Sequence, residues 1–335
     1  MKVLITGASG FGGSHLVEHC LACGDTVWGT VKPGESVQNL DHVLDQVTLR
    51  VGDMLDQSFL RKVLEEARFD LIFHLAGIAF VPFAQRNPTL TYNVNVLGTV
   101  HLLEALRNLS PQTRVLQVAS AEVYGDVEQA AMPILETHPI KPKSVLASSK
   151  AAAEIVAQTY IRSFDLPIVV ARPFNHTGPR QLPEFVVSNF CQQIAQIEAG
   201  RQPVLLCGNL SARRDFCDVR DIVRGYRTLA IKGKVGKAYN LCSGKSIAIA
   251  DLLDKLLALA RVNVRVEQAQ ERMRPVEVPD IYGSAQLIYE EVGWRREISF
   301  EKTLKDILNY HRDTIARRYT RRRFPLTAIV HRRGE

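Results

Sequence analysis

Four glycines of one short segment are spaced as in loops that bind phosphate groups. The segment runs from Thr6 to Leu16, and its glycines are Gly7, Gly10, Gly12 and Gly13. In such a loop one glycine permits a tight turn, a second lets the backbone approach a pyrophosphate, and a third lets a helix pack closely. Free N–H groups at the start of the following helix attract the phosphates. The chemistry that these residues predict is the binding of a dinucleotide.

The residues on either side of the loop predict the elements that hold it. Val3–Ile5 is an apolar run typical of a buried parallel strand, and Ser14–Cys23 has apolar residues at helical spacing. A strand, a glycine turn and a helix in this order favour a dinucleotide site over a tight turn without a ligand. The residues expected to contact the dinucleotide are Gly7, Ser9, Gly10, Phe11, Gly12 and Gly13.

Further strand candidates recur along the chain with helical stretches between them. The strands are expected at Thr26–Val31, Val47–Val51, Leu71–Leu75, Val115–Ala119, Ile168–Ala171 and Ala238–Cys242. The helices are expected at Ser58–Ala67, Val96–Leu106 and Lys150–Phe164. Alternation of this kind predicts an α/β fold with a doubly wound parallel sheet, the Rossmann architecture.

The chain is long enough for a second, smaller unit. We expect residues 1–172 and 216–250 to form the dinucleotide-binding domain. Residues 173–215 and 251–316 would form a partly discontinuous lobe that binds the second ligand, and residues 317–335 a basic tail. The ligands should lie beyond the carboxyl ends of the parallel strands.

Lys32 bears on the type of dinucleotide. NAD-binding folds usually carry an acidic residue at the end of the second strand, where it holds the ribose hydroxyls. Here Lys32 follows that strand, and the next acidic residue is Glu35. Lys32 would pair with a 2′-phosphate, which favours NADP over NAD; an exposed lysine in a turn is the alternative.

The ends of the third and fourth strands supply further cofactor-binding candidates. Asp53 and Met54 follow the third strand, where a carboxylate would hydrogen-bond the adenine. Leu75, Ala76 and Gly77 follow the fourth strand, where they would line the pyrophosphate. Each position is also compatible with an ordinary strand end.

Composition and charge argue against several classes of protein. Of 335 residues 46% are hydrophobic, yet no run of about 18 apolar residues appears, so we expect no membrane span. Because the sequence opens on a strand rather than a signal peptide, we expect a cytoplasmic protein. The net charge is +7, but residues 317–335 hold seven arginines and one glutamate. Such a run is usually a solvated end, so nucleic-acid binding is not expected.

The six cysteines are dispersed along the chain. Cys20 and Cys23 have CxxC spacing, but they lie within the first predicted helix, without a second pair or a histidine cluster. Structural zinc sites need such further ligands at regular spacing. We therefore expect reduced thiols that pack in the core, and no metal ion.

Motifs in the order typical of one enzyme family run through the chain. They are TGASGFGG, Gly52-Asp53, HLAG, Asn95-Val-Leu-Gly98-Thr99, Ser120-Ala-Glu122-Val-Tyr124-Gly125, Ser149-Lys150 and Arg172-Pro173-Phe174-Asn175. With them the chain resembles the extended short-chain dehydrogenase/reductases, or NAD-dependent epimerase/dehydratase family, that act on nucleotide sugars. The segments ARPFNHTGP, GNLSARRDFCDVRD, YNLCSG and MRPVEV resemble its GDP-sugar branch, which includes GDP-4-keto-6-deoxy-mannose reductases and GDP-mannose 4,6-dehydratases.

The resemblance implies a catalytic set of three residues. A serine or threonine orients the sugar, a tyrosine exchanges a proton with the sugar oxygen, and a lysine lowers the tyrosine pKa and binds the nicotinamide ribose. Ser120 and Lys150 match the first and the last of these. The tyrosine would stand four residues before the lysine, where this chain has Leu146, which cannot transfer a proton.

The resemblance also makes Glu122 a catalytic candidate. In the dehydratases of the family a glutamate at this spacing removes the C5 proton, beside an acid that protonates the leaving hydroxyl. The neighbour here is Ala121, so Glu122 suits reduction or epimerisation about as well as elimination. A structural carboxylate that caps nearby backbone is the alternative. Tyr124 is a nearby substitute for the missing tyrosine, although packing under the loop is favoured.

Other residues are assigned to the ligands by resemblance. Asn175 and Arg214 would contact the nucleotide diphosphate, and Arg274 and Glu277 would lie near the GDP moiety. A guanidinium suits phosphate oxygens and a carboxylate suits ribose hydroxyls or the guanine edge. A surface salt bridge is the alternative for the last two. The remaining assignments are Ser120 and Val187 to the substrate, and Lys150 and Pro173 to the dinucleotide.

Three functions stay open at this point. The first is NADP(H)-dependent reduction at the hexose C4, with an ordered water completing the proton network of Ser120 and Lys150. The second is GDP-mannose dehydration or a related epimerisation, which Glu122 favours and Ala121 opposes. The third is a catalytically impaired nucleotide-sugar-binding protein, which Leu146 supports.

The resemblance finally implies a homodimer or a pair of dimers. The helices expected to pack between the copies are Val96–Leu106 and Lys150–Phe164, and the small residues Ala151, Ala152 and Ala153 permit close packing. Burial within one copy explains the same pattern equally well.

Overall fold

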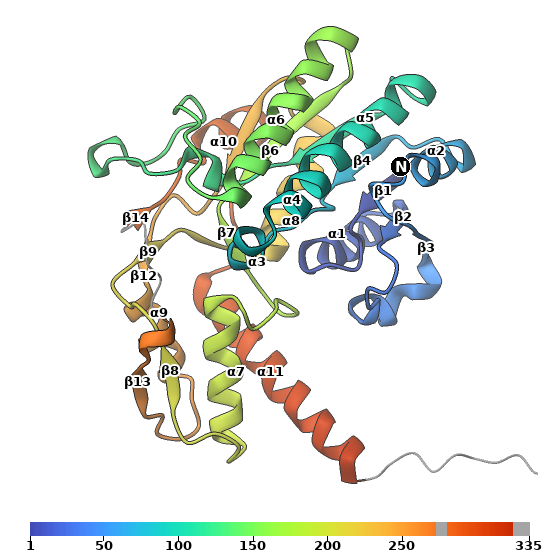
Figure 1. Ribbon diagram of the computed structural model, residues 1–335. Helices are drawn as coiled ribbons and strands as arrows, with labels where there is room; N and C mark the ends of the chain where they lie inside the picture. Colours follow the sequence, from blue (N-terminus) through green and yellow to red (C-terminus); the bar gives the residue numbers. More distant parts are fainter. Residues whose placement is uncertain (273–279, 324–335) are drawn as a thin grey trace, which may run out of the picture. The chain divides into compact units, whose positions relative to one another are not determined.

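The computed structural model describes residues 1–272 and 280–323, with side chains as far as residue 317 (Figure 1). Contacts divide the chain into two compact units. The first comprises Met1–Thr177, Ser211–Ala248 and Val276–Phe300, and the second comprises Gly178–Leu210, Ile249–Pro275 and Glu301–Glu335. The end of the basic tail, residues 324–335, lies outside the described residues. The assignment of residues 173–215 and 251–316 to nucleotide-sugar binding stays a prediction.

The first unit is built on one seven-stranded sheet. Its strands are β1 (Lys2–Thr6), β2 (Thr26–Val31), β3 (Val47–Val51), β4 (Leu71–His74), β5 (Arg114–Val118), β6 (Ile168–Pro173) and β11 (Ala238–Leu241). Their order is β11-β6-β5-β4-β1-β2-β3, and all neighbours are parallel. The order reverses between β1 and β4, the switch point at which doubly wound folds bind ligands. The predicted Rossmann fold is confirmed.

Helices cover both faces of this sheet (Figure 1). One face packs against α1 (Phe11–Ala22), α8 (Val219–Lys232) and α10 (Gln286–Val292). The other packs against α2 (Gln57–Glu66), α5 (Gly98–Leu109) and α6 (Val145–Phe164). Each face of the sheet thus has its own hydrophobic core. Alternate residues of β1 point to opposite faces, so Val3 packs in the first core and Leu4 in the second. Shorter helices of this unit are η1 (Gln38–Gln46), α3 (Val81–Arg86), α4 (Pro88–Tyr92), η2 (Asn93–Leu97), η3 (Ala121–Tyr124) and η4 (Gln129–Ala131).

Short strands extend the first unit beyond its main sheet. β7 (Asn175–Thr177) pairs in parallel with β10 (Phe216–Asp218). β9 (Arg213–Arg214) lies between β12 (Ile247–Ala248), its antiparallel neighbour, and β14 (Asp280–Ile281), its parallel neighbour. Strands of two or three residues are too short to carry a periodic pattern, so the sequence does not predict them.

One helix boundary differs from its prediction in a way that matters to the site. The helix expected at Lys150–Phe164 begins instead at Val145. The Ser144 hydroxyl accepts a hydrogen bond from the Ala147 N–H (3.0 Å) and so caps the earlier turn. All seven strands of the main sheet, by contrast, agree with their predicted bounds to within two residues. Leu146 therefore stands on α6, one turn before Lys150.

The second unit is mainly helical. It contains α7 (Val186–Glu198), α9 (Ile249–Leu257), η5 (Gln270–Arg272) and all but the first residue of α11 (Phe300–Arg323). β8 (Leu205–Cys207) pairs in parallel with β13 (Val266–Gln268). A largely buried ion pair between Arg312 and Glu198 (2.6 Å) joins α11 to α7.

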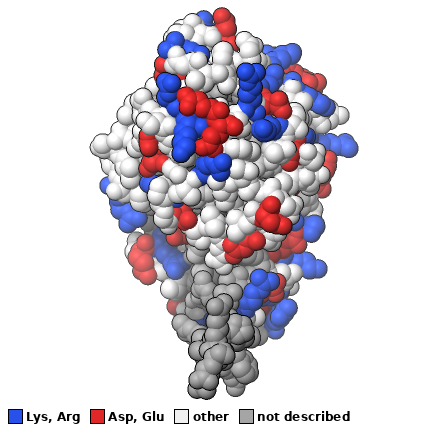
Figure 2. Space-filling model, turned by 90° about the vertical axis from the view of Figure 1, so that its right-hand side faces the viewer, with Lys and Arg blue, Asp and Glu red and all other residues white. Residues whose placement is uncertain are grey.

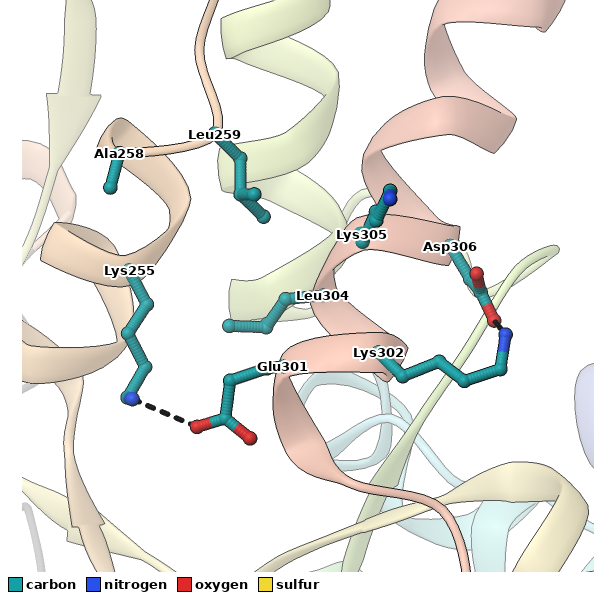
Figure 3. A pocket seen from close by; sticks show the side chains of 8 residues that line it. All are labelled: Lys255, Ala258, Leu259, Glu301, Lys302, Leu304, Lys305 and Asp306. Atoms are coloured by element: carbon teal, nitrogen blue, oxygen red, sulfur yellow. Dashed lines mark hydrogen bonds and ion pairs between the residues drawn. The ribbon is translucent and has the colours of Figure 1, made fainter.

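A cavity of about 530 Å³ lies between α9 and α11 in this unit (Figure 3). Apolar side chains of Ala258, Leu259 and Leu304 line part of it. Its charged side chains bind one another: Lys255 donates to Glu301 (2.8 Å) and Lys302 to Asp306 (2.9 Å). Four of its charged side chains are therefore already engaged in ion pairs with one another.

Positive and negative side chains are interspersed on the face of the molecule shown in Figure 2. Partly exposed ion pairs of the first unit include Arg50–Glu66 (2.6 Å) and Arg107–Glu104 (2.8 Å). Within the described residues, no helix is long and apolar enough to cross a membrane.

Candidate functional site

The glycine loop between β1 and α1 has the geometry of a dinucleotide cradle. Gly7 has φ +70°, and a Cβ there would lie 3.0 Å from the Cα of Ala76. A Cβ at Gly13 would overlap the carbonyl oxygen of Gly7. No side chain caps α1 at Gly10, so its first N–H groups remain available to phosphate oxygens. The residues present fit a pyrophosphate.

The loop is tied to the end of β4 through Thr6. The Thr6 hydroxyl accepts hydrogen bonds from the N–H groups of Leu75 (3.1 Å) and Ala76 (3.0 Å), and lies 2.9 Å from Nδ1 of His74. Nε2 of His74 lies 3.1 Å from the Thr99 hydroxyl on α5. Leu75, Ala76 and the following Gly77 are thereby held beside the glycine loop, at the switch point of the sheet.

The expected adenine end lies at the tips of β2 and β3. Nζ of Lys32 lies 4.0 Å from Oδ2 of Asp53, and about half of the Lys32 side chain is exposed. Asp53 accepts a hydrogen bond from the Leu55 N–H (2.9 Å), while Met54 is buried. Sequence reasoning missed Asn39, which lies on η1 after β2. Its side-chain N–H donates to the Ser9 carbonyl (3.0 Å) and so holds the glycine loop.

Ser120 and Glu122 follow the end of β5. The Ser120 hydroxyl accepts a hydrogen bond from the Glu122 N–H (3.2 Å) and caps η3. The side chain that caps the start of η3 is therefore that of Ser120. The side chain of Glu122 is exposed. An exposed carboxylate beside a half-buried hydroxyl is free to meet a ligand at the carboxyl edge of the sheet.

Tyr124 is packed within the protein. It is 1% exposed, its hydroxyl donates to Oδ1 of Asn240 (2.7 Å), and it accepts a hydrogen bond from Nη1 of Arg172 (2.8 Å). Burial raises its pKa to about 12. Arg172 in turn forms a buried ion pair with Glu154 of α6. These contacts agree with the packing that the sequence favours for Tyr124, and its role as a substitute for the missing tyrosine stays a prediction.

Lys150 reaches from α6 to the end of the sheet. Its Nζ donates to the backbone oxygen of Val118 (3.3 Å), and a Cβ at Gly77 would lie 3.4 Å from it. Lys150 is 9% exposed and Leu146 is 5% exposed. Burial lowers the pKa of Lys150 to about 8. The ammonium thus lies between the loop after β4 and the end of β5, where a nicotinamide ribose is expected.

Asn95 joins this loop to α6, although sequence reasoning gave it no role. Its side-chain N–H group donates to the Ser149 hydroxyl (2.8 Å) and to the Ile78 carbonyl (3.1 Å). Its Oδ1 accepts from the Ile78 N–H (2.7 Å), and the Ser149 hydroxyl donates to the Leu146 carbonyl (2.7 Å). The motif Asn95-Val-Leu-Gly98-Thr99 marks this stretch of the sequence. The hydrogen bonds of Asn95 depend on tertiary structure, so the motif alone does not predict them.

The predicted substrate residues fall into three groups. Asn175, exposed on β7, and Arg214, half-buried on β9, belong to the first unit together with Pro173 at the end of β6. Val187 is buried on α7 of the second unit. Arg274 and Glu277 lie outside the described residues.

His176, next to Asn175, is a site residue that sequence reasoning did not name. Its ring stacks on Phe11 of the glycine loop, with 5.9 Å between ring centroids and an interplanar angle of 10°. Nδ1 of His176 lies 3.1 Å from the Phe174 carbonyl oxygen. Part of the segment after β6 is thereby placed against the start of α1.

The cysteines form no metal site in the part of the chain that the structure describes. Cys20, Cys191, Cys207, Cys217 and Cys242 are buried, Cys23 is exposed, and all are free thiols. No group of three or more histidine, cysteine, aspartate or glutamate side chains there is placed to hold a metal ion.

Comparison with known proteins places this geometry in a family. The family model described as GDP-mannose 4,6 dehydratase matches residues 4–307. A GDP-6-deoxy-D-mannose reductase of Pseudomonas aeruginosa is 34% identical over 309 residues, which cover 92% of this chain and 96% of that protein. A GDP-mannose 4,6 dehydratase of Arabidopsis thaliana is 29% identical over 318 residues, covering 90% and 87%.

A solved structure extends the comparison to three dimensions. The structure of RMD from Pseudomonas aeruginosa complexed with NADPH has a TM-score of 0.82 and 33% sequence identity, and the match covers 93% of this chain and 99% of that one. The order of the sequence motifs, the strand order of the sheet and the family match over residues 4–307 all point to the same family. The chain belongs to the GDP-mannose 4,6-dehydratase family of extended short-chain dehydrogenase/reductases.

Proposed function

We propose that this chain is an NADP(H)-dependent enzyme that reduces the 4-keto group of a GDP-linked 6-deoxyhexose. The observation that carries the proposal is the similarity, over nearly the whole chain, to a GDP-6-deoxy-D-mannose reductase whose solved relative holds NADPH. The geometry supports it, because the glycine loop, Lys32 and Lys150 lie at the carboxyl edge of one sheet.

Residues from several strand ends would hold the dinucleotide. The first N–H groups of α1 would bind the pyrophosphate, together with the backbone of Gly10 and Gly13. Lys32 would pair with the 2′-phosphate, and its neighbour Asp53 would meet the adenine. Lys150 would donate to the nicotinamide ribose. The bound dinucleotide supplies the hydride for the reduction.

The sugar nucleotide would be held by groups that match its charge. Arg214 suits the diphosphate because a guanidinium donates a fixed fork of hydrogen bonds. Asn175, exposed at the start of β7, would add amide hydrogen bonds. Ser120 would orient the sugar oxygen at C4. Arg274, Glu277 and Val187 remain proposed contacts of the nucleotide.

Dehydration of GDP-mannose is the second candidate function. The exposed carboxylate of Glu122 favours it, since such a base is needed to remove the C5 proton. Elimination also needs an acid for the leaving hydroxyl, and Ala121 cannot supply one. Binding of the ligands without turnover is the third candidate, and its support is Leu146.

One set of assays separates the three candidates. The reductase consumes NADPH when GDP-4-keto-6-deoxy-mannose is added, whereas the dehydratase converts GDP-mannose in the presence of NADP⁺ into a 4-keto product. Both products are resolved by chromatography and mass spectrometry. Binding of NADPH and GDP-mannose without consumption of either sugar would overturn the enzyme proposal and leave the binding protein.

We also propose that two copies of the chain pack through α5 and α6, which lie side by side (Figure 1). Leu97, which precedes α5, is 46% exposed, and Ile155 on α6 is 60% exposed. A partner copy that packs on these helices would cover both side chains.

A further inference from the structure

Leu146 leaves the proposed reduction without a tyrosine to supply the proton, so the contacts of Lys150 decide where a proton can come from. Its ammonium can donate three hydrogen bonds, and the one made within residues 1–272 and 280–323 goes to the Val118 carbonyl (3.3 Å). No carboxylate in that part of the chain forms an ion pair with Lys150. The Nζ therefore keeps donor capacity at the sheet edge where the sugar is expected.

The charged and titratable groups around Lys150 leave its charge unneutralised. Glu154, one turn further along α6, is bound by the guanidinium of Arg172 from β6. His74 from β4 stays neutral, because burial and the Lys150 charge lower its pKa to about 3. Glu122, which follows β5, is exposed and makes no described bond to Lys150.

These surroundings also change the acidity of the ammonium. A solvated lysine has a pKa near 10.4 and gives up its proton reluctantly at neutral pH. Burial without a paired carboxylate lowers the pKa of Lys150 to about 8. A general acid works best when its pKa lies near the working pH. Leu146, one turn earlier on the same buried face, adds apolar surface where a tyrosine would add a hydroxyl.

Other proton carriers near α6 are excluded by their own contacts. Both hydrogen-bonding directions of the Tyr124 hydroxyl are used by buried partners. The Tyr92 hydroxyl lies 2.6 Å from the Ser148 hydroxyl, but Ser148 is two residues from both Leu146 and Lys150. At 3.6 residues per turn it lies on the opposite side of the helix. Of Tyr92, Tyr124 and Lys150, Lys150 is the side chain that lies at the sheet edge where the sugar is expected with donor capacity left.

We propose that Nζ of Lys150 is the proton donor to the sugar O4 in this enzyme, a role that rests on the proposed reductase function. Arrival of the hydride at C4 forms a C–H bond, breaks the C4=O π bond and leaves its electron pair on O4. An N–H bond of the ammonium then breaks as the O4–H bond forms, either directly or through the Ser120 hydroxyl. The neutral amine regains a proton from water before the next turnover.

The test compares Lys150→Arg in two backgrounds. Arginine keeps the positive charge but cannot release a proton. In the natural sequence we expect kcat to fall at least 100-fold, the usual size of a general-acid contribution. In Leu146→Tyr, where a phenol donates the proton, the same change should lower kcat less than tenfold. Lys62→Arg, at an exposed position of α2, is the matched control.

Two further measurements use the natural sequence, and a third checks the variant. The kcat/KM for keto-sugar reduction should be level at low pH and fall tenfold per pH unit above about 8, because the amine form cannot donate. In the protein without ligands, the rate of Lys150 acetylation by acetic anhydride, followed by mass spectrometry, should rise with pH through the same midpoint. NADPH fluorescence titration checks that Lys150→Arg still binds the cofactor.

The outcomes separate this proposal from the function on which it rests. Turnover that persists in Lys150→Arg, or equal losses in both backgrounds, would overturn the proton-donor role and leave the reductase intact. An acetylation midpoint near that of exposed lysines would overturn it as well. Absence of any NADPH consumption by the natural sequence at every pH would overturn both.

Discussion

Leu146 is buried one turn before Lys150, at the position where the resemblance to the family implies a catalytic tyrosine. Replacing it by tyrosine places a phenol beside the ammonium, which stabilises the phenolate. We predict at least a tenfold gain in the rate of keto-sugar reduction for Leu146→Tyr, in line with the usual contribution of a positioned acid. Stopped-flow measurement of NADPH consumption checks it.

Leu146→Phe is the matched control, because it adds the ring without the hydroxyl. A gain in both variants would mean that ring packing, and not proton transfer, raises the rate. No gain in either would mean that the site has been rebuilt around the leucine.

Lys32 allows a second prediction at the residue scale. Its exposed ammonium has a carboxylate 4.0 Å away and is expected to meet the 2′-phosphate that distinguishes NADP from NAD. Lys32→Ala should weaken NADPH binding about tenfold, since a solvent-exposed charge-assisted contact contributes on the order of 1 kcal/mol. NADH binding should change less than twofold. Fluorescence titration with both dinucleotides measures the ratio, and an equal loss for both would contradict this role.

Individual residues were predictable to the extent that a motif fixes their position. The glycines, Ser120 and Lys150 are recognised from local pattern and lie at the sheet edge as that pattern requires. The bonds of Asn95 and Asn39 join segments 17 and 30 residues apart, so no local pattern reveals them. The packing of Tyr124 under Arg172 has the same cause, since its partners come from β6 and β11.

At the scale of elements, α6 has a buried face, on which the proposed catalytic residues lie, and a face at the surface. Lys150 and Leu146 are buried, while Ile155 is 60% exposed. If two copies pack through α5 and α6, Ile155→Lys should place a charge in that interface and convert a dimer into a monomer. Sedimentation velocity measures the change. Val235→Lys, at a 44% exposed position outside these helices, is the control and should leave the dimer intact.

The elements were predictable where they are long and apolar. β1, β4 and β6 are buried over nearly all of their length and contain continuous apolar runs, from which their bounds are predicted closely. The helix α6 begins five residues earlier than predicted. Its first turn is held by the single hydroxyl of Ser144, which follows Pro142 and Lys143, and one capping residue is a weak signal in the sequence. The π-helical turn η2 before α5 has no sequence pattern that distinguishes it from an α-helix.

At the scale of the whole molecule, two buried histidines, one taken from each unit, contribute to a dependence of stability on pH. Burial lowers the pKa of His74 to about 3 in the first unit and that of His311 to about 4 in the second. Both values lie below the unfolded value of about 6.5. As pH falls, the unfolded chain therefore takes up these protons first, so stability is complete above pH 6.5 and is lost below it.

We predict a slope of about 1.4 kcal/mol per pH unit for each histidine between pH 6.5 and its folded-state pKa. His74→Gln should remove the part of the slope that His74 contributes in the first unit, and His311→Gln the part that His311 contributes in the second. Urea unfolding at several pH values, followed by a probe in each unit, measures both. A slope that is unchanged in either variant would contradict the assignment for that unit.

Thr6 fixes two neighbouring loops with one hydroxyl, and this has a consequence for ligand affinity. The N–H groups of Leu75 and Ala76 both point at it, so the strand end that precedes the glycine loop and the segment that faces it form a single rigid surface before any dinucleotide arrives. Binding then requires little ordering of the protein, and the contact energy is retained as affinity. A valine of the same shape would leave two partly buried donors without this acceptor and loosen that surface, so the cofactor would dissociate faster while its contacts stayed the same.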